Sequence, residues 1–387
     1  MNLKERDSLY IANTYKRFPV ELQTGKGSLV YDETGKRYID MGSGIAVTSF
    51  GIADEAWIAA VTAQLSRLQH ASNLYYTSPC VELAELLCRK TGMKKVFFSN
   101  SGAEANECAV KVAREYGRTH LGEEYYTVVT LKGSFHGRTI TTLSATGQEH
   151  YHEKFRPMTP GFLHTAPGDL AELRSLFRKE KIAAILIECI QGEGGVVPLD
   201  PVYAKEAERI AKENGALLMV DEVQTGNGRT GTLYSYEGYG LSPDVVSTAK
   251  GLAGGLPMGA TLLGEKTESI LGYGDHGSTF GGNPVAAAGA LSILSRLDDG
   301  FLASVEKKGA LLREALEGAD GIEAVTGRGL MIGLKTVRPA PEVVARAMEK
   351  GVLCLTAKDK VRLLPALNIP TELLLEAAGI IREAAAG

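Results

Sequence analysis

The sequence has few of the features that mark whole classes of protein. Its cysteines are odd in number and scattered, and no two are spaced as a C-x-x-C pair, so neither a disulfide framework nor a structural zinc site is expected. The five are Cys80, Cys88, Cys108, Cys189 and Cys354. Lysine and arginine number 42 against 46 acidic residues, and this net charge of −4 argues against nucleic acid or an anionic membrane as a partner.

Long apolar runs are missing as well. The longest are short stretches such as Ile182–Ile187, whereas a membrane span needs about 18 to 20 apolar residues. The first ten residues are charged and lack the apolar stretch of a signal peptide. We therefore expect a cytoplasmic protein that does not enter a membrane.

What the chain does have is enough apolar material for a large core. Its 387 residues suit one large domain with a smaller one, and 44% hydrophobic with 23% charged residues is typical of a globular protein. Glycine is in excess, at 45 residues, or about 12% against a usual ~7%. The extra glycines cluster beside reactive side chains, so we expect the functional site there.

Short β-rich runs alternate with amphipathic stretches through the middle of the chain. The expected strands are 96–99, 127–131, 183–187, 216–220 and 245–248, and two expected helices are 103–116 and 202–214. This order is typical of an α/β fold with a mostly parallel sheet. The run 216–220 is apolar throughout, which predicts a central strand with helices on both faces.

The two ends of the chain have a different pattern. From about Asp298 onward come a long helical segment, a strand-like run at 330–334 and terminal helices, while turn formers within residues 30–39 are typical of a hairpin. We expect three parts. They are an N-terminal segment, residues 1–50, that packs with a small C-terminal domain, residues 291–387, and a large domain, residues 51–290.

Ligands of open parallel sheets bind at the carboxyl ends of the strands, so residues that directly follow a strand are candidates for a site. The candidates obtained in this way are Ser101, Glu188, Asp221 and Lys250. Ser101 and Glu104 fit the capping box of a helix start. The same stretch, with Gly102, would also serve as a cup for a phosphate, and both interpretations stay open.

Asp221 ends the most hydrophobic run, where a buried carboxylate needs a partner. It would accept backbone N–H bonds or pair with Arg229, or else hold the protonated ring nitrogen of a cofactor. Lys250 lies between Ala249 and Gly251 at a strand end. Most lysines are simply exposed, but the small neighbours, this position and the upstream aspartate favour a nucleophile for Schiff-base chemistry.

An aromatic ring, an imidazole and a guanidinium follow the run 127–131, at Phe135, His136 and Arg138. Phe135 belongs either in the core or against a planar ring. Arg138 is suited to bidentate recognition of a carboxylate, because its planar guanidinium matches the two oxygens.

Six motifs in order give the chain a family resemblance. They are Ser43–Val47, Phe135–Arg138, Gln191–Gly195, Asp221–Gln224, His276–Pro284 and Leu364–Asn368. With the strand-end aspartate and the later lysine, the chain resembles the class III, fold-type I pyridoxal-phosphate aminotransferases over nearly its full length. The resemblance implies a large α/β domain with a mostly parallel central sheet and a smaller α+β domain.

The resemblance implies pyridoxal 5′-phosphate as the cofactor, with no metal ion. Lys250 would bind it covalently and later move a proton between substrate and cofactor, while Asp221 would hold the pyridinium nitrogen. The other residues assigned to the cofactor are Ser101, Gly102, Ala103, Phe135, Val223, Gln224 and Thr279. Gln224 would contact the phenolic oxygen, and Thr279 would reach the phosphate from the neighbouring subunit, so the active unit would be a homodimer.

For the substrates, the resemblance assigns the α-carboxylate to Arg362, the distal carboxylate of glutamate or 2-oxoglutarate to Arg138, and a substrate contact from the neighbouring subunit to Ser278. Glu193 would pair with an arginine for one substrate and release it for the other. The motifs are most similar to the branch that acts on acylated ornithine. Its two half reactions convert N2-acetylornithine into a semialdehyde and 2-oxoglutarate into glutamate, a step of arginine biosynthesis.

Three departures from the family pattern affect the details. Cys189 stands where proline is usual, Asn227 stands where an apolar residue is usual, and residues 49–57 lack the customary Gly-His-x-His-Pro. The alternatives are a transaminase for ornithine, succinylornithine or 4-aminobutyrate, an aminomutase of the glutamate-semialdehyde type, or a non-catalytic cofactor-binding protein. Gln224 and Arg362 favour the transaminase over the aminomutase.

Overall fold

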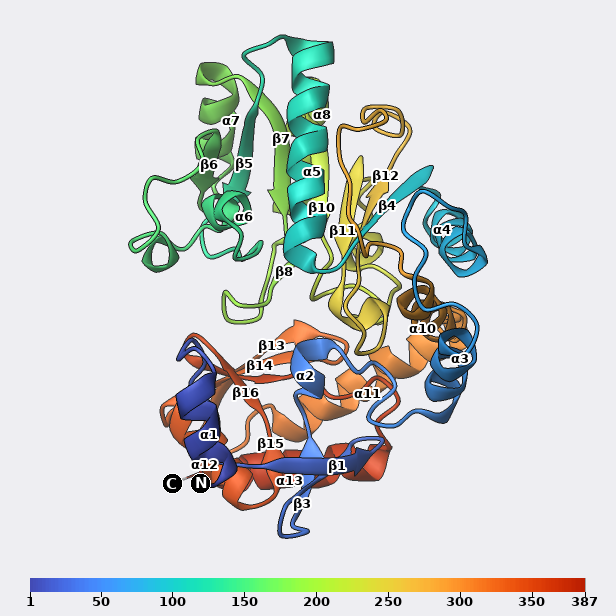
Figure 1. Cartoon of the computed structure of the whole chain (residues 1–387). Helices are drawn as coiled ribbons and strands as arrows, with labels where there is room; N and C mark the ends of the chain where they lie inside the picture. Colours follow the sequence, from blue (N-terminus) through green and yellow to red (C-terminus); the bar gives the residue numbers. More distant parts are fainter. Residues whose placement is uncertain (387) are drawn as a thin grey trace.

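A seven-stranded sheet forms the centre of the larger part of the molecule (Figure 1), in a computed structural model that describes residues 1–386. In spatial order its strands are β4 (Lys95–Ser99), β12 (Gly259–Leu263), β11 (Val245–Thr248), β10 (Leu217–Asp221), β7 (Ile182–Ile187), β5 (Thr127–Leu131) and β6 (Phe162–Thr165). β12 runs antiparallel to both of its neighbours, and the other neighbouring pairs are parallel. The predicted α/β fold with a mostly parallel sheet is confirmed.

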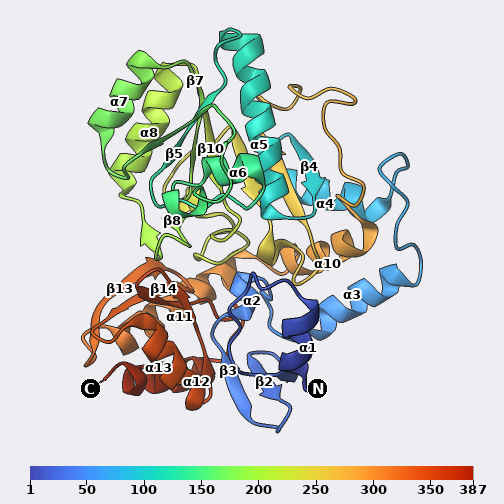
Figure 2. The same cartoon turned by 60° about the vertical axis from the view of Figure 1, so that its left-hand side comes forward.

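Helices cover both faces of this sheet. Figure 2 shows α5 (Gly102–Tyr116) on one side of the strands, with α7 (Leu170–Lys179) and α8 (Pro201–Glu213) on the other. α5 buries Ala105, Ala109, Val112 and Tyr116, whose spacing puts them on one side of a helix. Every residue of β7 and β10 is buried, as a strand covered on both faces requires.

The five predicted strands coincide with β4, β5, β7, β10 and β11 to within one residue at each end. β10 lies between β7 and β11, so the prediction of a central strand there is confirmed. β6 and β12 were not predicted. Both are short, and β12 starts directly after a Pro-Met pair that interrupts any β-rich pattern.

The smaller part of the molecule joins the two ends of the chain. Its first sheet holds β1 (Leu22–Lys26), β2 (Leu29–Asp32), β3 (Arg37–Asp40) and β15 (Val352–Leu353). β2 and β3 form the hairpin predicted at residues 30–39, and β15 pairs parallel with β3. Both views place the first strands beside the C-terminal helices. The domain boundaries at residues 50 and 290 stay predictions.

A second sheet and three helices complete this part. Its strands are β13 (Ile322–Arg328), β14 (Met331–Thr336), β17 (Lys360–Leu363) and β16 (Leu355–Ala357). The helices are α11 (Asp299–Leu316), α12 (Ala340–Glu349) and α13 (Thr371–Ala385), which contact one another and the strands. A long helix followed by strands and a terminal helix is the order that the sequence predicts after Asp298.

The remaining elements connect or border these parts. The longer ones are α1 (Leu3–Tyr10), α3 (Glu55–Leu65), α4 (Ser78–Thr91) and α10 (Pro284–Leu294), and α10 packs against both α3 and α4. The short ones are α2 (Ser43–Ala46), η1 (Gly117–Leu121), α6 (Ile140–Ala145), η2 (Glu149–Tyr151), β8 (Ile190–Gln191), β9 (Val197–Pro198), α9 (Ser235–Gly238) and η3 (Lys250–Leu252). None of the helices in residues 1–386 has the length and apolar character needed to cross a lipid bilayer.

A buried arginine links the two parts near the ends of the parallel strands. Arg229 follows β10, and its guanidinium donates to the carbonyl oxygens of Leu330 (3.0 Å) and Pro365 (2.5 Å) in the smaller part. Pro365 lies three residues beyond Arg362 on β17. This link therefore brings β17 toward the edge of the sheet where the candidate site lies.

Candidate active site

A cavity of about 390 Å³ opens at the carboxyl ends of the parallel strands. Its volume lies within the range of about 300 to 1,000 Å³ that is usual for small-molecule sites. All four strand-end candidates, Ser101, Glu188, Asp221 and Lys250, line it. The position of the cavity follows from the topology, because the parallel strands all end at this edge.

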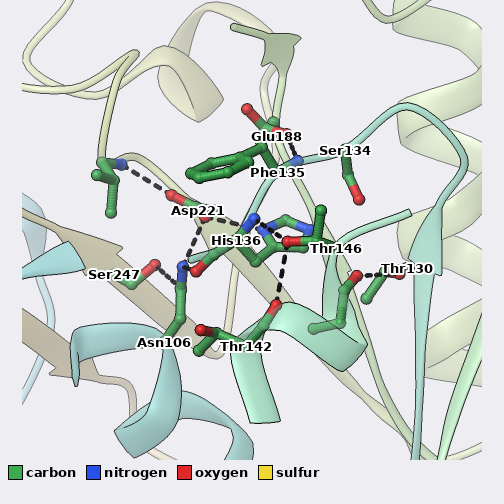
Figure 3. Close-up of polar contacts among 12 residues, drawn as sticks. Asn106, Thr130, Ser134, Phe135, His136, Thr142, Thr146, Glu188, Asp221 and Ser247 are labelled. Atoms are coloured by element: carbon green, nitrogen blue, oxygen red, sulfur yellow. Dashed lines mark hydrogen bonds and ion pairs between the residues drawn. The ribbon is translucent and has the colours of Figure 1, made fainter. Parts of the chain in front are cut away.

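Asp221 is buried and held by three donors (Figure 3). Oδ2 lies 2.7 Å from Asn106 Nδ2 and 2.8 Å from His136 Nδ1, and Oδ1 accepts the Val223 N–H at 2.9 Å. The pairing with Arg229 that the sequence left open is not formed, since that guanidinium donates to the carbonyls of the smaller part. The acid is therefore fixed in orientation by neighbours that support its negative charge.

The donors that hold Asp221 are themselves held. Asn106 Nδ2 also donates to the carbonyl of His136 at 2.8 Å, and Asn106 Oδ1 accepts from the Ser247 hydroxyl on β11. The His136 N–H bonds to Thr146 Oγ1 at 2.9 Å. Sequence reasoning missed Asn106 and gave His136 no role. Their distance from Asp221 along the chain, 115 and 85 residues, leaves no local signal that would have joined them.

Lys250 follows β11 and starts the short helical turn η3. Its backbone φ is +46°, a left-handed value that residues with a Cβ seldom adopt. Burial lowers the pKa of Lys250 below the ordinary lysine value, although Glu193 and Asp221 act against this shift. The lowered pKa favours the neutral amine, which is the nucleophilic form.

The start of α5 forms another wall of the cavity. Ser101 caps the helix, with Oγ 3.2 Å from the Glu104 N–H, and the next two residues, Gly102 and Ala103, line the cavity. A Cβ placed on Gly102 would lie 2.5 Å from Val223 Cγ1, so only glycine fits against that side chain. Ser101 thus caps the helix as predicted, while the Glu104 carboxylate accepts the Asn100 N–H at 3.0 Å and does not close the capping box. The helix start is also placed where an anion would meet it.

Phe135 lies half-buried in the wall of the cavity, and its N–H bonds to Glu188 Oε1 at 2.9 Å. The exposed Arg138 has its guanidinium carbon 5.4 Å from the Phe135 ring centre and 4.2 Å from that of Tyr151. Sequence reasoning missed Tyr151, which lies in η2 and has no motif around it. The two rings hold a cation at the mouth of the cavity by cation–π attraction.

Glu188 is a buried carboxyl at the end of β7. Besides the Phe135 N–H, it accepts the Gly192 N–H at 3.2 Å. Burial raises the pKa of Glu188 to about 7, against the opposing effect of His136. Near neutral pH this group therefore changes its protonation readily.

Arg362, Glu193 and Gln224 form a closed triangle. Arg362 makes an ion pair with Glu193 and donates to Gln224 Oε1 at 3.0 Å, while Gln224 Nε2 donates to Glu193 Oε1 at 3.2 Å. Burial by itself would raise the pKa of Glu193, but the Arg362 guanidinium outweighs it and holds that pKa below its usual range. Arg362 Nε is buried and has no hydrogen-bond partner among residues 1–386.

Four predicted site residues do not line the cavity of their own chain: Glu193 and Arg362, which bond to the lining residue Gln224, and Ser278 and Thr279. Ser278 Oγ accepts from Asn100 Nδ2 (3.2 Å) and from the Gly281 N–H (2.9 Å), and Thr279 is exposed. Phe280, the next residue, is also exposed. This surface position agrees with the expectation that Ser278 and Thr279 serve another subunit, which stays a prediction.

The segment without the Gly-His-x-His-Pro motif is held by other contacts. Asp54 caps α3 through the Trp57 N–H (2.9 Å) and pairs with Arg296 at 2.8 Å. Trp57 Nε1 donates to the carbonyl of Ala253, just after the turn that holds Lys250, at 3.0 Å. The tryptophan thus ties the segment to the residue that follows the Lys250 turn.

The residues present fit pyridoxal phosphate by their chemistry. The cavity combines a buried amine, a fixed acid for a ring nitrogen, a helix start for a phosphate and the faces of Phe135 and Val223 for a flat ring. The electrostatics also fit. The start of α5 attracts anions and so suits the phosphate, and Asp221 attracts a cation and so suits a protonated ring nitrogen. Gln224, which also lines the cavity, adds an amide beside them.

Residues 10–385 match the family model of the class III aminotransferases. The acetylornithine aminotransferase of Haemophilus ducreyi is 48% identical over 374 residues, which cover 96% of this chain and 95% of that protein. The curated acetylornithine aminotransferase of Caldanaerobacter subterraneus is 42% identical and covers 96% of this chain and 96% of its own.

Solved structures of aminotransferases share the fold. The N-acetylornithine aminotransferase from Stenotrophomonas maltophilia has a TM-score of 0.85 at 33% identity and covers 99% of this chain and 98% of its own. The family model and these full-length likenesses agree on one family of proteins. The chain belongs to the class III aminotransferases.

Proposed function

We propose that the protein moves the side-chain amino group of N2-acetylornithine to 2-oxoglutarate, forming N-acetylglutamate 5-semialdehyde and glutamate. The names of two relatives of similar length and more than 40% identity support this substrate. The observation that carries the proposal is the closed Arg362–Glu193 pair beside a cavity lined by Lys250 and Asp221. While this ion pair is closed, Glu193 neutralises Arg362, and the neutral acyl group of the substrate meets no unpaired cation there.

The cofactor is pyridoxal phosphate, the cofactor of the family. When bound, it supplies reversible capture of primary amines and takes up the electron pair released from the carbon that bears the amine. Asp221 would hold the ring nitrogen in its cationic form, and Gln224 would contact the ring oxygen. Gly102 and Ala103 would bind the phosphate with Ser101, while Phe135 and Val223 would enclose the ring faces.

Lys250 would act twice. Its neutral amine would hold the cofactor covalently. When not so engaged, the same amine would act as the base that accepts the proton from the amine-bearing carbon of the substrate and gives it back. The lowered pKa of Lys250 suits this work, because a base near neutral pH must release the proton it accepts.

Two arginines would bind the carboxylates of 2-oxoglutarate. Arg138, at the mouth of the cavity, would bind the distal carboxylate of 2-oxoglutarate. Arg362 would bind the α-carboxylate of the same molecule after its ion pair with Glu193 opens. The unpartnered Nε of Arg362 gives the incoming carboxylate a second donor. Glu193 thereby lets one site accept two differently charged substrates in turn, an acylated amino acid with one carboxylate and a dicarboxylate.

We also propose that the active unit is a cytoplasmic homodimer, with Ser278 and Thr279 reaching the partner's site. Exposed apolar side chains border these residues, among them Phe280 and Tyr273, and others lie at Leu74 and Tyr76. Apolar surface of this kind favours burial against a second copy. The oligomeric state in solution tests this part.

The function is tested with a panel of amine donors and 2-oxoglutarate. N2-acetylornithine should give the highest kcat/KM, ahead of N2-succinylornithine, ornithine and 4-aminobutyrate. Added alone, it should convert the visible absorbance of the holoenzyme to that of the aminated cofactor. Conversion by 4-aminobutyrate and not by N2-acetylornithine would contradict the substrate, and product formed without 2-oxoglutarate would point to an aminomutase.

A further inference from the structure

The backbone of Lys250 is strained and therefore needs support. A non-glycine residue in the left-handed region is strained, and such conformations persist only where neighbouring contacts fix them. Two side chains from distant segments contact the turn that contains Lys250. Asn227 bonds to the residues just before it, and Ser49 bonds to the residue just after it.

Asn227 makes the closer of these contacts. Its side chain is buried, and Nδ2 lies 3.1 Å from the Ala249 carbonyl oxygen and 3.0 Å from Thr248 Oγ1. The Ala249 carbonyl belongs to the peptide group that joins Ala249 to Lys250, so it defines the plane from which the φ angle of Lys250 is measured. Because a carbonyl oxygen only accepts, the amide must face it with its nitrogen.

The position of Asn227 suits this contact. It lies between Gly226 and Gly228 in the turn after β10, and its own φ is +57°. Asparagine tolerates a left-handed backbone better than most residues with a side chain. The same turn continues into Arg229, which is anchored to the smaller part. The amide is thus presented from a rigid segment that begins at Asp221.

Ser49 contacts the turn after Lys250. Its hydroxyl donates to the Gly251 carbonyl at 3.2 Å. A Cβ on Gly251 would lie 2.7 Å from Ser49 Oγ and 3.5 Å from the Cβ of Asn227. Both side chains therefore lie against the residue after Lys250, and a Cβ at Gly251 would meet Ser49 Oγ at less than contact distance.

We propose that Asn227 is a positioning residue for Lys250. By fixing the peptide plane before the lysine, its amide returns the Lys250 amine to one place each time that amine is released. The Ala249 carbonyl also accepts the Leu252 N–H at 3.0 Å within the turn, and an aliphatic side chain at position 227 would leave that bond as its only donor, so that the plane is held on one side. This inference rests on the role of Lys250 in the proposed function.

The test compares Asn227→Gly and Asn227→Asp with the unaltered protein. Glycine keeps the left-handed backbone and removes the amide, while aspartate keeps the shape and turns an acceptor toward the Ala249 carbonyl. Asn214→Ala is the matched control, since Asn214 also donates to a backbone carbonyl, that of Ile210 at 2.8 Å, but lies outside the cavity. Thr248→Val removes the second acceptor and leaves the Ala249 bond in place.

Two rates are measured beside the thermal midpoint of each protein. One is the capture of added pyridoxal phosphate by the apoprotein, located on Lys250 by borohydride reduction and peptide mass. The other is the single-turnover reaction with the amine donor. Both should fall about tenfold in the two Asn227 variants, because a small misplacement of a reacting group has effects of this size, while KM stays within about twofold. The Asn214 and Thr248 variants should react at the normal rates.

Several results would overturn the inference. Asn227→Gly reacting at the normal rates would remove the role, and a tenfold loss in Thr248→Val would transfer it to the Thr248 hydroxyl. If the glycine variant melts well below the Asn214 control, the aspartate variant, which has the same size, decides. Failure of the unaltered protein to capture the cofactor at Lys250 would instead refute the proposed function.

Discussion

The two halves of the candidate site are built differently. On the sheet side, Asp221 is buried and takes three hydrogen bonds, and Lys250 lies in a turn that two side chains hold by hydrogen bonds. On the opposite side, Arg138 is exposed and held by two aromatic rings. Arg362 there is bound to a carboxylate that a substrate would have to displace.

The difference indicates that the two halves have different roles, one in the chemistry and one in substrate binding. Groups that must keep one geometry through the whole reaction sit on strand ends, where the fold holds them without further adjustment. Groups that must accept two substrates of different charge have partners that can be exchanged. The rigid half should then respond to substitution by losing the chemistry, and the exchangeable half by changing substrate preference.

The largest effect is expected for Lys250→Ala. Without the amine, turnover should fall by more than about a hundredfold, because both covalent capture and proton transfer are lost. The measurement is kcat with N2-acetylornithine, and borohydride should no longer fix the cofactor to the chain. Lys358→Ala is the matched control, since Lys358 also has a left-handed φ, +52°, but is exposed and outside the cavity. A loss below a hundredfold would count against the assignment of Lys250.

Glu193→Gln should change preference and leave the chemistry intact. Without the Glu193 carboxylate, Arg362 binds the carboxylates of substrates more readily. The KM for 2-oxoglutarate should therefore fall, and the KM for N2-acetylornithine should rise. The ratio of the two kcat/KM values should shift by about thirtyfold, which corresponds to about 2 kcal/mol. Equal changes in both half reactions would assign Glu193 to the rigid half instead.

The sequence predicts the rigid half much better than the exchangeable one. Ser101, Asp221 and Lys250 follow from strand positions alone, because parallel strands end at one edge and each strand is visible as an apolar run. The donors that orient Asp221, such as Asn106, come from segments far along the chain. No periodicity or spacing relates them to the acid.

The exchangeable half depends on contacts between the two parts of the molecule. Arg362 reaches Glu193 only because β17 is brought to the end of the sheet, and a lone arginine in a strand of the smaller part gives no sign of this. The family resemblance supplied both residues where the residue pattern did not. It did not supply Tyr151, whose stacking on Arg138 appears only in three dimensions.

Arg138→Lys should raise the KM for 2-oxoglutarate about tenfold. Lysine keeps the charge but loses the fork that binds both oxygens of a carboxylate. The rate of cofactor capture by Lys250 should not change, because Arg138 lies at the mouth of the cavity and makes no contact with the lysine turn. The KM from initial rates checks the first point, and an unchanged KM would remove the role of Arg138.

Tyr151→Leu should have a smaller effect on the same constant. It removes the ring that lies 4.2 Å from the Arg138 guanidinium, and a cation–π contact of this kind is worth about 1 kcal/mol. We expect the KM for 2-oxoglutarate to rise about threefold to fivefold. Tyr151→Phe keeps the ring and serves as the control. If phenylalanine has the same effect as leucine, the hydroxyl and not the ring face is what matters.

The smallest effect concerns a buried acid of the rigid half, Glu222, next to Asp221. It accepts from the hydroxyls of Thr225 (2.6 Å) and Ser235 (2.7 Å), and burial raises its pKa to about 7. A carboxyl whose pKa is raised by folding contributes stability below its unfolded pKa near 4.3, and that contribution is lost as the pH rises through about 7. Glu193, with its lowered pKa, behaves in the opposite sense.

Glu222→Gln should therefore remove part of the loss of stability between pH 5 and pH 8. The thermal midpoint of the variant minus that of the unaltered protein should become more positive by a few degrees over this range, since about 1 kcal/mol corresponds to roughly 2 to 4 °C. Effects of Glu188 cancel in this difference because both proteins contain it. Glu265→Gln, at an exposed position, should give a constant difference. A constant difference for Glu222→Gln as well would mean that this acid is ionised at both pH values. Burial on the sheet side would then not make Glu222 harder to charge than Glu193.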